Sequence, residues 1–129
     1  MSTLAMPEPN AALIGRRDEI VSALEKALGL GVVISDPAET LAYECDALTA
    51  YRCPPLAVVL PRSTEEVAAA LRVCHERGVP VTPRGSGTSL AGGALPTADG
   101  VILGVARVNE VLEIDYENRV VKVQTGVTN

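Results

Sequence analysis

Apolar positions near the start of the chain recur with the period of a helix. Their spacing of three and four residues predicts a helix over 16–28, ended by Gly29. The apolar stripe consists of Ile20, Val21, Leu24 and Leu28. The first ten residues mix polar residues with two prolines, so we expect them to be loose at their start.

A second helix is predicted over 63–77. Ser63 and Glu66 have the spacing of a capping box, in which each side chain binds a free N–H at the helix start. Gly78 is the expected left-handed stop. The predicted buried stripe of this helix is Val67, Leu71 and Cys74.

Short apolar runs predict the strands of a sheet. They lie at 31–35, 56–60, 79–82 and 101–105. The run at 56–60 is uninterrupted, as expected of a strand covered on both faces. Strand, helix and strand over 56–82 predict a βαβ unit with parallel strands.

The remaining segments have weaker patterns. Residues 40–55 have no clear period, and we predict a loop with one helical turn. A further helical turn is predicted at 108–112, followed by a hairpin of 113–116 and 119–124 around Glu117 and Asn118. Asn118 is the residue expected to supply a positive φ there. The fold class is therefore α+β: an N-terminal helix, then a βαβ unit and a small mixed sheet.

Composition excludes several classes of function. The chain has 129 residues, a net charge of −5 and 47% apolar residues, but neither Phe nor Trp. This length gives one compact domain or part of a larger one. The acidic balance argues against a nucleic-acid partner. Neither a secretory signal nor a run of about 20 apolar residues is present, so we expect no membrane span. Three cysteines are an odd number, which favours free thiols and a cytoplasmic location.

The glycine-rich stretch 83–96 is the most informative part of the sequence. It follows a predicted strand, and its glycines let backbone N–H groups converge into a concavity that binds anions. Thr88 and Ser89 add hydroxyl groups. Arg84 either neutralises a bound anion or locks the loop by hydrogen bonds to carbonyls. Leu90 departs from the dinucleotide fingerprint, and the lysine of a P-loop is missing. An ordinary mobile surface loop is the alternative.

The sequence PRGSGTSLAGGALP resembles the flavin pyrophosphate loop of the FAD-linked oxidase family, whose FAD domain is of the vanillyl-alcohol-oxidase/p-cresol-methylhydroxylase (PCMH) type. YECDALTAYR and the strand after it are similar to the flavin subunit of bacterial glycolate oxidase. The resemblance implies that FAD lies between two half-domains. It implies an N-terminal segment at 1–55 and the first FAD-binding half at 56–129.

The resemblance also implies the residues that bind FAD. They are Pro83, Arg84, Gly85, Ser86, Gly87, Thr88, Ser89, Gly92 and Gly93, with Gly126 and Val127 from the trailing VQTGVTN. Thr125 stands where the family usually has Pro, which weakens the assignment of the last two. The family's metal-binding histidines and active-site base lie beyond this chain, so we expect no catalytic or metal-binding residue here.

The implied activity is the oxidation of a small 2-hydroxy acid, glycolate to glyoxylate, with hydride transfer to FAD. D-Lactate and D-2-hydroxyglutarate are alternative substrates. The implied partners are a second flavin-type subunit and an iron–sulfur subunit, with the enzyme in the cytoplasm or at the inner face of the membrane. Residues 1–129 alone are expected to be inactive, to hold FAD poorly and to self-associate. A non-catalytic assembly module and a nucleotide-binding protein unrelated to flavin are the competing functions.

Other polar residues have simpler interpretations. Cys74 and His75 are adjacent on a helix and do not face each other, so a catalytic pair is not expected. Cys45 and Cys53 match no common zinc spacing. Glu44 and Asp46 are interpreted as a polar cap on a loop rather than as a site.

Overall fold

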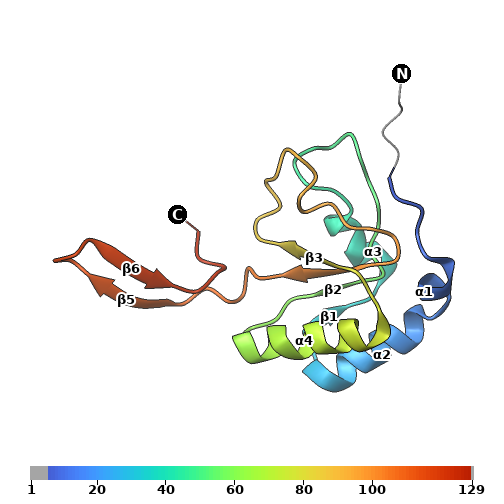
Figure 1. Ribbon diagram of the computed structural model, residues 1–129, viewed down its shortest axis with the longest axis horizontal. Coiled ribbons are helices and arrows are strands. Elements are labelled where there is room, and N and C mark those ends of the chain that lie inside the picture. The colour runs from blue at the N-terminus through green and yellow to red at the C-terminus, as the bar shows by residue number, and fades with distance from the viewer. Residues whose placement is uncertain (1–5, 129) are drawn as a thin grey trace.

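The computed structural model describes residues 6–128 and contains a layered body with a projecting hairpin (Figure 1). Two helices, α2 and α4, lie on one face of a four-stranded sheet, and long loops lie on the other. The hairpin β5–β6 extends away from this body. The expected looseness of residues 1–5 concerns a part of the chain outside the described residues.

The helices follow the predicted pattern closely and add shorter ones. They are α1 (Ala11–Gly15), α2 (Arg17–Leu28), α3 (Pro37–Thr40), the 3-10 helix η1 (Leu41–Tyr43) and α4 (Thr64–Arg77). The short α1 was not predicted, although Asn10 caps it by accepting from Ala12 N–H at 3.0 Å. Among residues 6–128, none of the helices has the length and apolar character needed to cross a bilayer.

The sheet has an order that the sequence pattern does not give. Its strands are β1 (Val33–Ile34), β2 (Ala57–Val59), β3 (Val81–Arg84) and β4 (Val101–Gly104). The order is β1-β2-β4-β3, with β1 antiparallel to β2 and the other pairs parallel. The strands flanking α4 are parallel as predicted, but β4 lies between them. Ile102 therefore has Val58 on one side and Thr82 on the other.

The core lies between the sheet and the two helices. Its helical contribution includes Ile20 and Leu24, both fully buried, and its sheet contribution includes Val59 and Val101. All three residues of β2 and all four of β4 are buried, as an uninterrupted apolar run predicts.

The predicted buried stripe of α4 is wrong at Leu71, which is 44% exposed. The helix instead buries Ala70, Val73 and Cys74 and turns Val67 partly inward. Small residues on the inner face allow α4 to pack closely beside α2. Periodicity alone favoured the larger Leu71, but the close approach of α2 favours Ala70.

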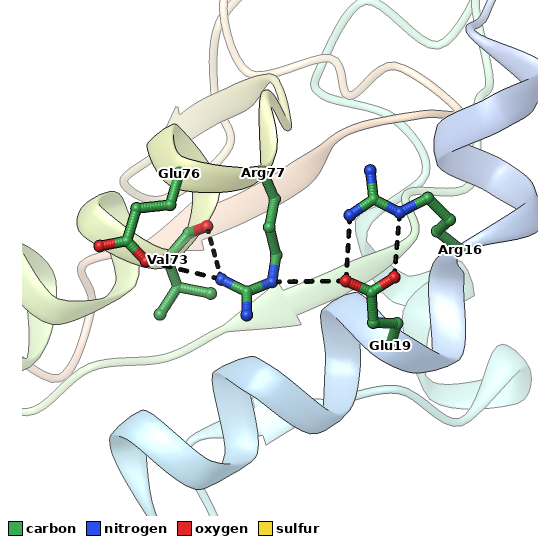
Figure 2. A network of polar contacts seen from close by, with 5 residues as sticks. All are labelled: Arg16, Glu19, Val73, Glu76 and Arg77. Atoms are coloured by element: carbon green, nitrogen blue, oxygen red, sulfur yellow. Dashed lines mark hydrogen bonds and ion pairs between the residues drawn. The ribbon is translucent and has the colours of Figure 1, made fainter.

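A network of charged side chains connects the surfaces of α2 and α4 (Figure 2). The Glu19 carboxylate accepts a hydrogen bond from Arg16 Nε through its Oε2 at 3.0 Å. Its Oε1 lies 3.9 Å from Arg77 Nε on α4. The hydrogen bond from Arg16 lowers the pKa of the Glu19 carboxyl below its usual value. Arg16 and Glu19 are exposed and Arg77 is partly buried, so we expect these ion pairs to add little to stability, most of which comes from the apolar core.

The start of α4 differs slightly from the predicted capping box. Ser63 Oγ accepts from Glu66 N–H at 3.2 Å, as predicted. The Glu66 carboxylate, however, accepts from the N–H of Arg62 at 2.7 Å, one residue earlier than expected. Gly78 ends the helix in the left-handed region with φ 67°.

The last part of the chain corrects two predictions. The prediction of a helical turn at 108–112 is wrong, because β5 (Val111–Asp115) begins within this range and pairs with β6 (Val120–Val123). The hairpin is confirmed, but Arg119 has the positive φ of 55°. Asn118 instead donates its N–H and its Nδ2 to the Asp115 carboxylate, at 3.0 and 2.7 Å.

Replacing Ser63 with Ala should weaken the first turn of α4. The N–H of Glu66 loses its acceptor, which costs about 1 kcal/mol, so amide exchange there should become roughly fivefold faster. Hydrogen exchange followed by mass spectrometry in the full-length protein measures this change. The exposed Ser22→Ala on α2 is the matched control and should leave exchange in α4 unchanged. Equal exchange in Ser63→Ala and the parent would contradict the capping role.

Candidate cofactor site

The candidate site begins where two neighbouring parallel strands end. β3 ends at Arg84 and β4 at Gly104, and Val105 N–H donates to the carbonyl of Arg84 at 2.9 Å. The loops that follow therefore leave the same edge of the sheet side by side. Ligands of open parallel sheets commonly bind outside this carboxyl edge.

An open pocket of about 570 Å³ lies at this edge and joins three segments. The glycine-rich loop contributes Gly85, Ser86 and Thr88, and the turn after β6 contributes residues 125–128. Ala106 and Asn109 complete the lining. The structure thus brings part of the loop together with Gly126 and Val127, which lie about 40 residues further along the chain. All nine lining residues are uncharged, so the wall contains no carboxylate that would repel an anion.

The loop leaves a row of backbone donors free. The N–H groups of residues 85–89 have no acceptor within the described part of the chain. Gly87 has φ 71°, and a left-handed residue among successive N–H groups is typical of an anion-binding nest. Gly85 has no atom within 4 Å of an added Cβ, so that side of the loop is open. These features fit a diphosphate bound by backbone donors.

The second half of the glycine-rich loop closes upon itself. Ser89 Oγ accepts from the N–H groups of Ala91 and Gly93, at 3.3 and 3.1 Å. Gly92 has φ 77°, and its carbonyl accepts from Leu95 N–H at 3.1 Å. Ser89, Gly92 and Gly93 do not line the pocket and instead shape the loop. Pro83 lies within β3 and is also outside the lining.

Arg84 turns its side chain beneath the loop rather than into the pocket. Its Nη1 donates to the carbonyl of Cys45 at 2.7 Å, and a longer contact of 3.5 Å reaches the carbonyl of Ala94. Its Cζ lies 5.5 Å from the centre of the Tyr43 ring. A Cβ on Gly87 would come within 2.5 Å of the same Cζ. Glycine is thus needed at 87 for the positive φ, and a Cβ there would also displace the guanidinium.

The terminal turn is held against the segment after β4. Gly126 N–H donates to the carbonyl of Val108 at 2.7 Å, and Val127 N–H donates to Gln124 at 3.2 Å. A Cβ on Gly126 would collide with the carbonyl of Val105 and lie 2.8 Å from that of Val108. Glycine is needed here for close backbone packing. The N–H groups of Gly126 and Val127 are already used, so these residues form a wall of the pocket rather than a set of donors.

Four lining residues were missed from the sequence, and two of them, Thr125 and Thr128, flank the predicted Gly126 and Val127. Ala106 and Asn109 were assigned no site role, and Asn109 lies in the segment wrongly predicted to be helical. The available signal was their position directly after a buried strand. In a parallel sheet, such positions lie at the ligand-binding edge.

The other polar candidates have structural roles. His75 is exposed on α4, whereas Cys74 is 1% exposed, and burial raises the pKa of its thiol to about 11. Glu44 pairs with Arg52 at 2.7 Å. Asp46 is buried, and its Oδ1 accepts from Leu48 N–H at 2.9 Å. These contacts agree with a polar cap on the 44–52 loop.

Comparison with known proteins identifies the family. A family model described as an FAD binding domain matches residues 55–129. The chain belongs to this FAD-binding family. FAD, the cofactor expected from the resemblance, is thereby confirmed. The free N–H groups and uncharged lining of the pocket fit this cofactor's diphosphate.

Individual relatives agree with this assignment. The glycolate oxidase subunit GlcD of Escherichia coli K12 is 47% identical over 116 residues, which are 90% of this chain and 23% of that protein. The mitochondrial D-2-hydroxyglutarate dehydrogenase of Bos taurus is 38% identical over 109 residues, 84% of this chain and 20% of that protein. The chain therefore spans about a quarter or less of the length of these relatives.

A solved structure shows the same fold. The structure of p-cresol methylhydroxylase with substrate bound matches with a TM-score of 0.76 at 23% identity. The match covers 88% of this chain and 23% of the other. The expected α+β fold of the PCMH type is thus confirmed.

The three cysteines should differ in reactivity. All are free, with Cys45 and Cys53 partly exposed and Cys74 buried. At about pH 8, a thiol of pKa about 11 is a thiolate in roughly one molecule in a thousand, so Cys74 should resist alkylation. Iodoacetamide labelling of the native full-length protein, mapped by mass spectrometry, tests this expectation. After denaturation without reductant, all three should react. A cysteine that reacts only after reduction would reveal a disulfide.

Proposed function

We propose that this chain binds the diphosphate of FAD within a dehydrogenase that oxidises a small 2-hydroxy acid. The observation that carries the proposal is the pocket joining the glycine-rich loop to the 125–128 turn, with the N–H groups of residues 85–89 lacking an internal acceptor. Backbone donors and glycines suit an anion that approaches the main chain closely.

Each wall of the pocket has a separate task in this proposal. In the free stretch 85–89, the residues that line the pocket are Gly85, Ser86 and Thr88, and their N–H groups with the hydroxyls of Ser86 and Thr88 bind the phosphate oxygens. Asn109 offers both a donor and an acceptor from the segment after β4. Gly126 and Val127 close the opposite side. When bound, FAD supplies the redox chemistry as a hydride acceptor, and the residues of this chain fix its position.

Glycolate is the proposed substrate. The 47% identity with the glycolate oxidase subunit extends over most of the chain and includes the 43–52 segment before the FAD-binding domain. D-2-Hydroxyglutarate and D-lactate are the alternatives, supported by the bovine relative at 38% identity and by the D-lactate dehydrogenase of Anaerostipes hadrus at 47% identity over 73 residues. We place the residues that select the substrate in parts of the full-length protein beyond these 129 residues.

The proposed setting follows from the same relative. GlcD is described as a subunit, which supports a protein of several subunits. From the family resemblance, we propose that the full-length protein works with a second flavin-type subunit and an iron–sulfur subunit. Electrons from reduced FAD would leave through these partners. We place the complex in the cytoplasm or at the inner face of the membrane.

Replacing Gly85 with Ala should weaken FAD binding without unfolding the protein. Gly85 lines the pocket, its φ is outside the left-handed region, and an added Cβ meets no protein atom. The methyl group would instead stand where the diphosphate approaches, and we expect the Kd for FAD to rise about tenfold or more. Calorimetric titration of the FAD-free full-length protein measures the Kd.

Gly15→Ala is the matched control, because a Cβ on Gly15 also meets no protein atom and Gly15 does not line the pocket. Neither variant should lower the melting temperature of the FAD-free parent, and Gly15→Ala should raise it slightly, because alanine favours the helix α1. An unchanged Kd for FAD in Gly85→Ala would contradict binding at this face of the loop.

The activity is tested by dye reduction with the purified full-length protein. We expect a flavin absorption spectrum and the highest kcat/KM with glycolate, compared with D-lactate and D-2-hydroxyglutarate. A higher kcat/KM with either alternative would move the substrate assignment to that acid. A flavin-loaded protein that oxidises none of the three would contradict the dehydrogenase proposal. Residues 1–129 alone should show no turnover.

A further inference from the structure

The charged side chain at the start of the glycine-rich loop is held by a segment that precedes the FAD-binding domain. Arg84 is the last residue of β3, and its Nη1 donates to the carbonyl of Cys45 at 2.7 Å. Tyr43, the last residue of η1, presents its ring face 5.5 Å from Cζ of the same guanidinium. Tyr43 and Cys45 both lie outside residues 55–129, the region that the FAD-binding family model matches. The contacts combine a charge-assisted hydrogen bond with a cation–π interaction.

The same guanidinium connects the two ends of the loop. It belongs to the residue that begins the loop, and it lies 3.5 Å from the carbonyl of Ala94, which is buried at the other end. Gly87 turns directly over it, so closely that a Cβ there would overlap the guanidinium. The left-handed turn at Gly87 is therefore formed against the side chain of Arg84.

The partners of Arg84 are themselves fixed. Glu44, between Tyr43 and Cys45, pairs with Arg52, and its carbonyl accepts from Cys53 N–H at 2.7 Å. The neighbouring Asp46 is buried and caps the following turn through Leu48 N–H. The 43–46 segment is thus a firm support rather than a free loop.

We propose that Arg84, clamped by Tyr43 and the carbonyl of Cys45, is a positioning residue that holds the N–H groups of residues 85–89 in their anion-binding arrangement, and not a ligand of the phosphates. Arg84 does not line the pocket, whereas Gly85, Ser86 and Thr88 do. Its planar donors are directed to main-chain carbonyls. Tyr43 becomes a residue of the cofactor site although it touches no cofactor. This inference rests on the proposed binding of FAD by the loop.

The test measures the Kd for FAD of the full-length protein and its variants by calorimetry. Arg84→Gln and Tyr43→Leu should each raise the Kd about 30-fold, because each releases the clamp. Tyr43→Phe keeps the aromatic face and should stay within about threefold of the parent. Arg84→Lys should not restore binding, because an ammonium lacks the planar fork. The double variant Tyr43→Leu/Arg84→Gln should have a Kd no higher than that of the weaker-binding single variant, since both substitutions disrupt the same clamp.

Direct phosphate contact by Arg84 predicts different results. Arg84→Lys would then retain most of the affinity, Tyr43→Leu would leave the Kd unchanged, and Arg84→Gln would reduce the salt dependence of the Kd. A positioning role leaves the salt dependence of Arg84→Gln the same as that of the parent. Any of the three results for direct contact would overturn the proposal.

Two controls separate this inference from a loss of folding and from failure of the proposed function. Arg72→Gln removes an exposed arginine on α4 and should not change the Kd. Circular dichroism and the melting temperature of each FAD-free variant report folding. If Arg84→Gln or Tyr43→Leu does not fold, Arg84→Lys decides, since it keeps the charge and most of the stem: a tenfold or greater rise in Kd supports the clamp, and an unchanged Kd overturns it. Absence of FAD binding by the parent protein would overturn the proposed function instead.

Discussion

The arrangement of the site depends on the insertion of β4 between β2 and β3. β4 is buried along its whole length and shares its backbone hydrogen bonds with a strand on each side. Parallel strands end at the same edge, so this insertion places the glycine-rich loop after β3 beside the 105–109 segment after β4. Without it, Ser86 and Asn109 would not share a pocket.

A short series of backbone hydrogen bonds carries this order outward from the sheet. The Arg84 carbonyl accepts from Val105, the Val105 carbonyl from Val108, and the Val108 carbonyl from Gly126. The projecting hairpin is thereby joined to the body next to the loop. Because Gly126 has no side chain, the backbone of the terminal turn approaches the 105–108 segment closely enough to form the second wall.

The electrostatics of the site differ from those of the chain as a whole. The net charge is −5, yet the pocket lining contains no charged residue. In the proposed site, the free N–H groups of residues 85–89 would supply the positive potential at its wall, with the guanidinium of Arg84 packed against Gly87. Binding by fixed dipoles suits a cofactor that must be held in one orientation, because such donors need no rearrangement when the ligand arrives.

Local patterns in the sequence determined the elements with local causes. Ser63 and Gly78 mark the two ends of α4, because a cap and a left-handed stop act within one turn. β2 (Ala57–Val59) forms inside the 56–60 run, because an uninterrupted apolar run suits a position covered on both faces. The glycine-rich loop was likewise identifiable, since its composition and its place after a strand are properties of adjacent residues.

Only the tertiary structure decided the features that depend on distant neighbours. The position of β4, the burial of Ala70 instead of Leu71 and the presence of Asn109 in the pocket follow from which elements pack together. The contacts of the Arg84 guanidinium could not be predicted locally, because its partner Cys45 lies 39 residues away. Spacing along a chain fixes what a segment can form, whereas the choice among its faces and partners is made by packing between segments.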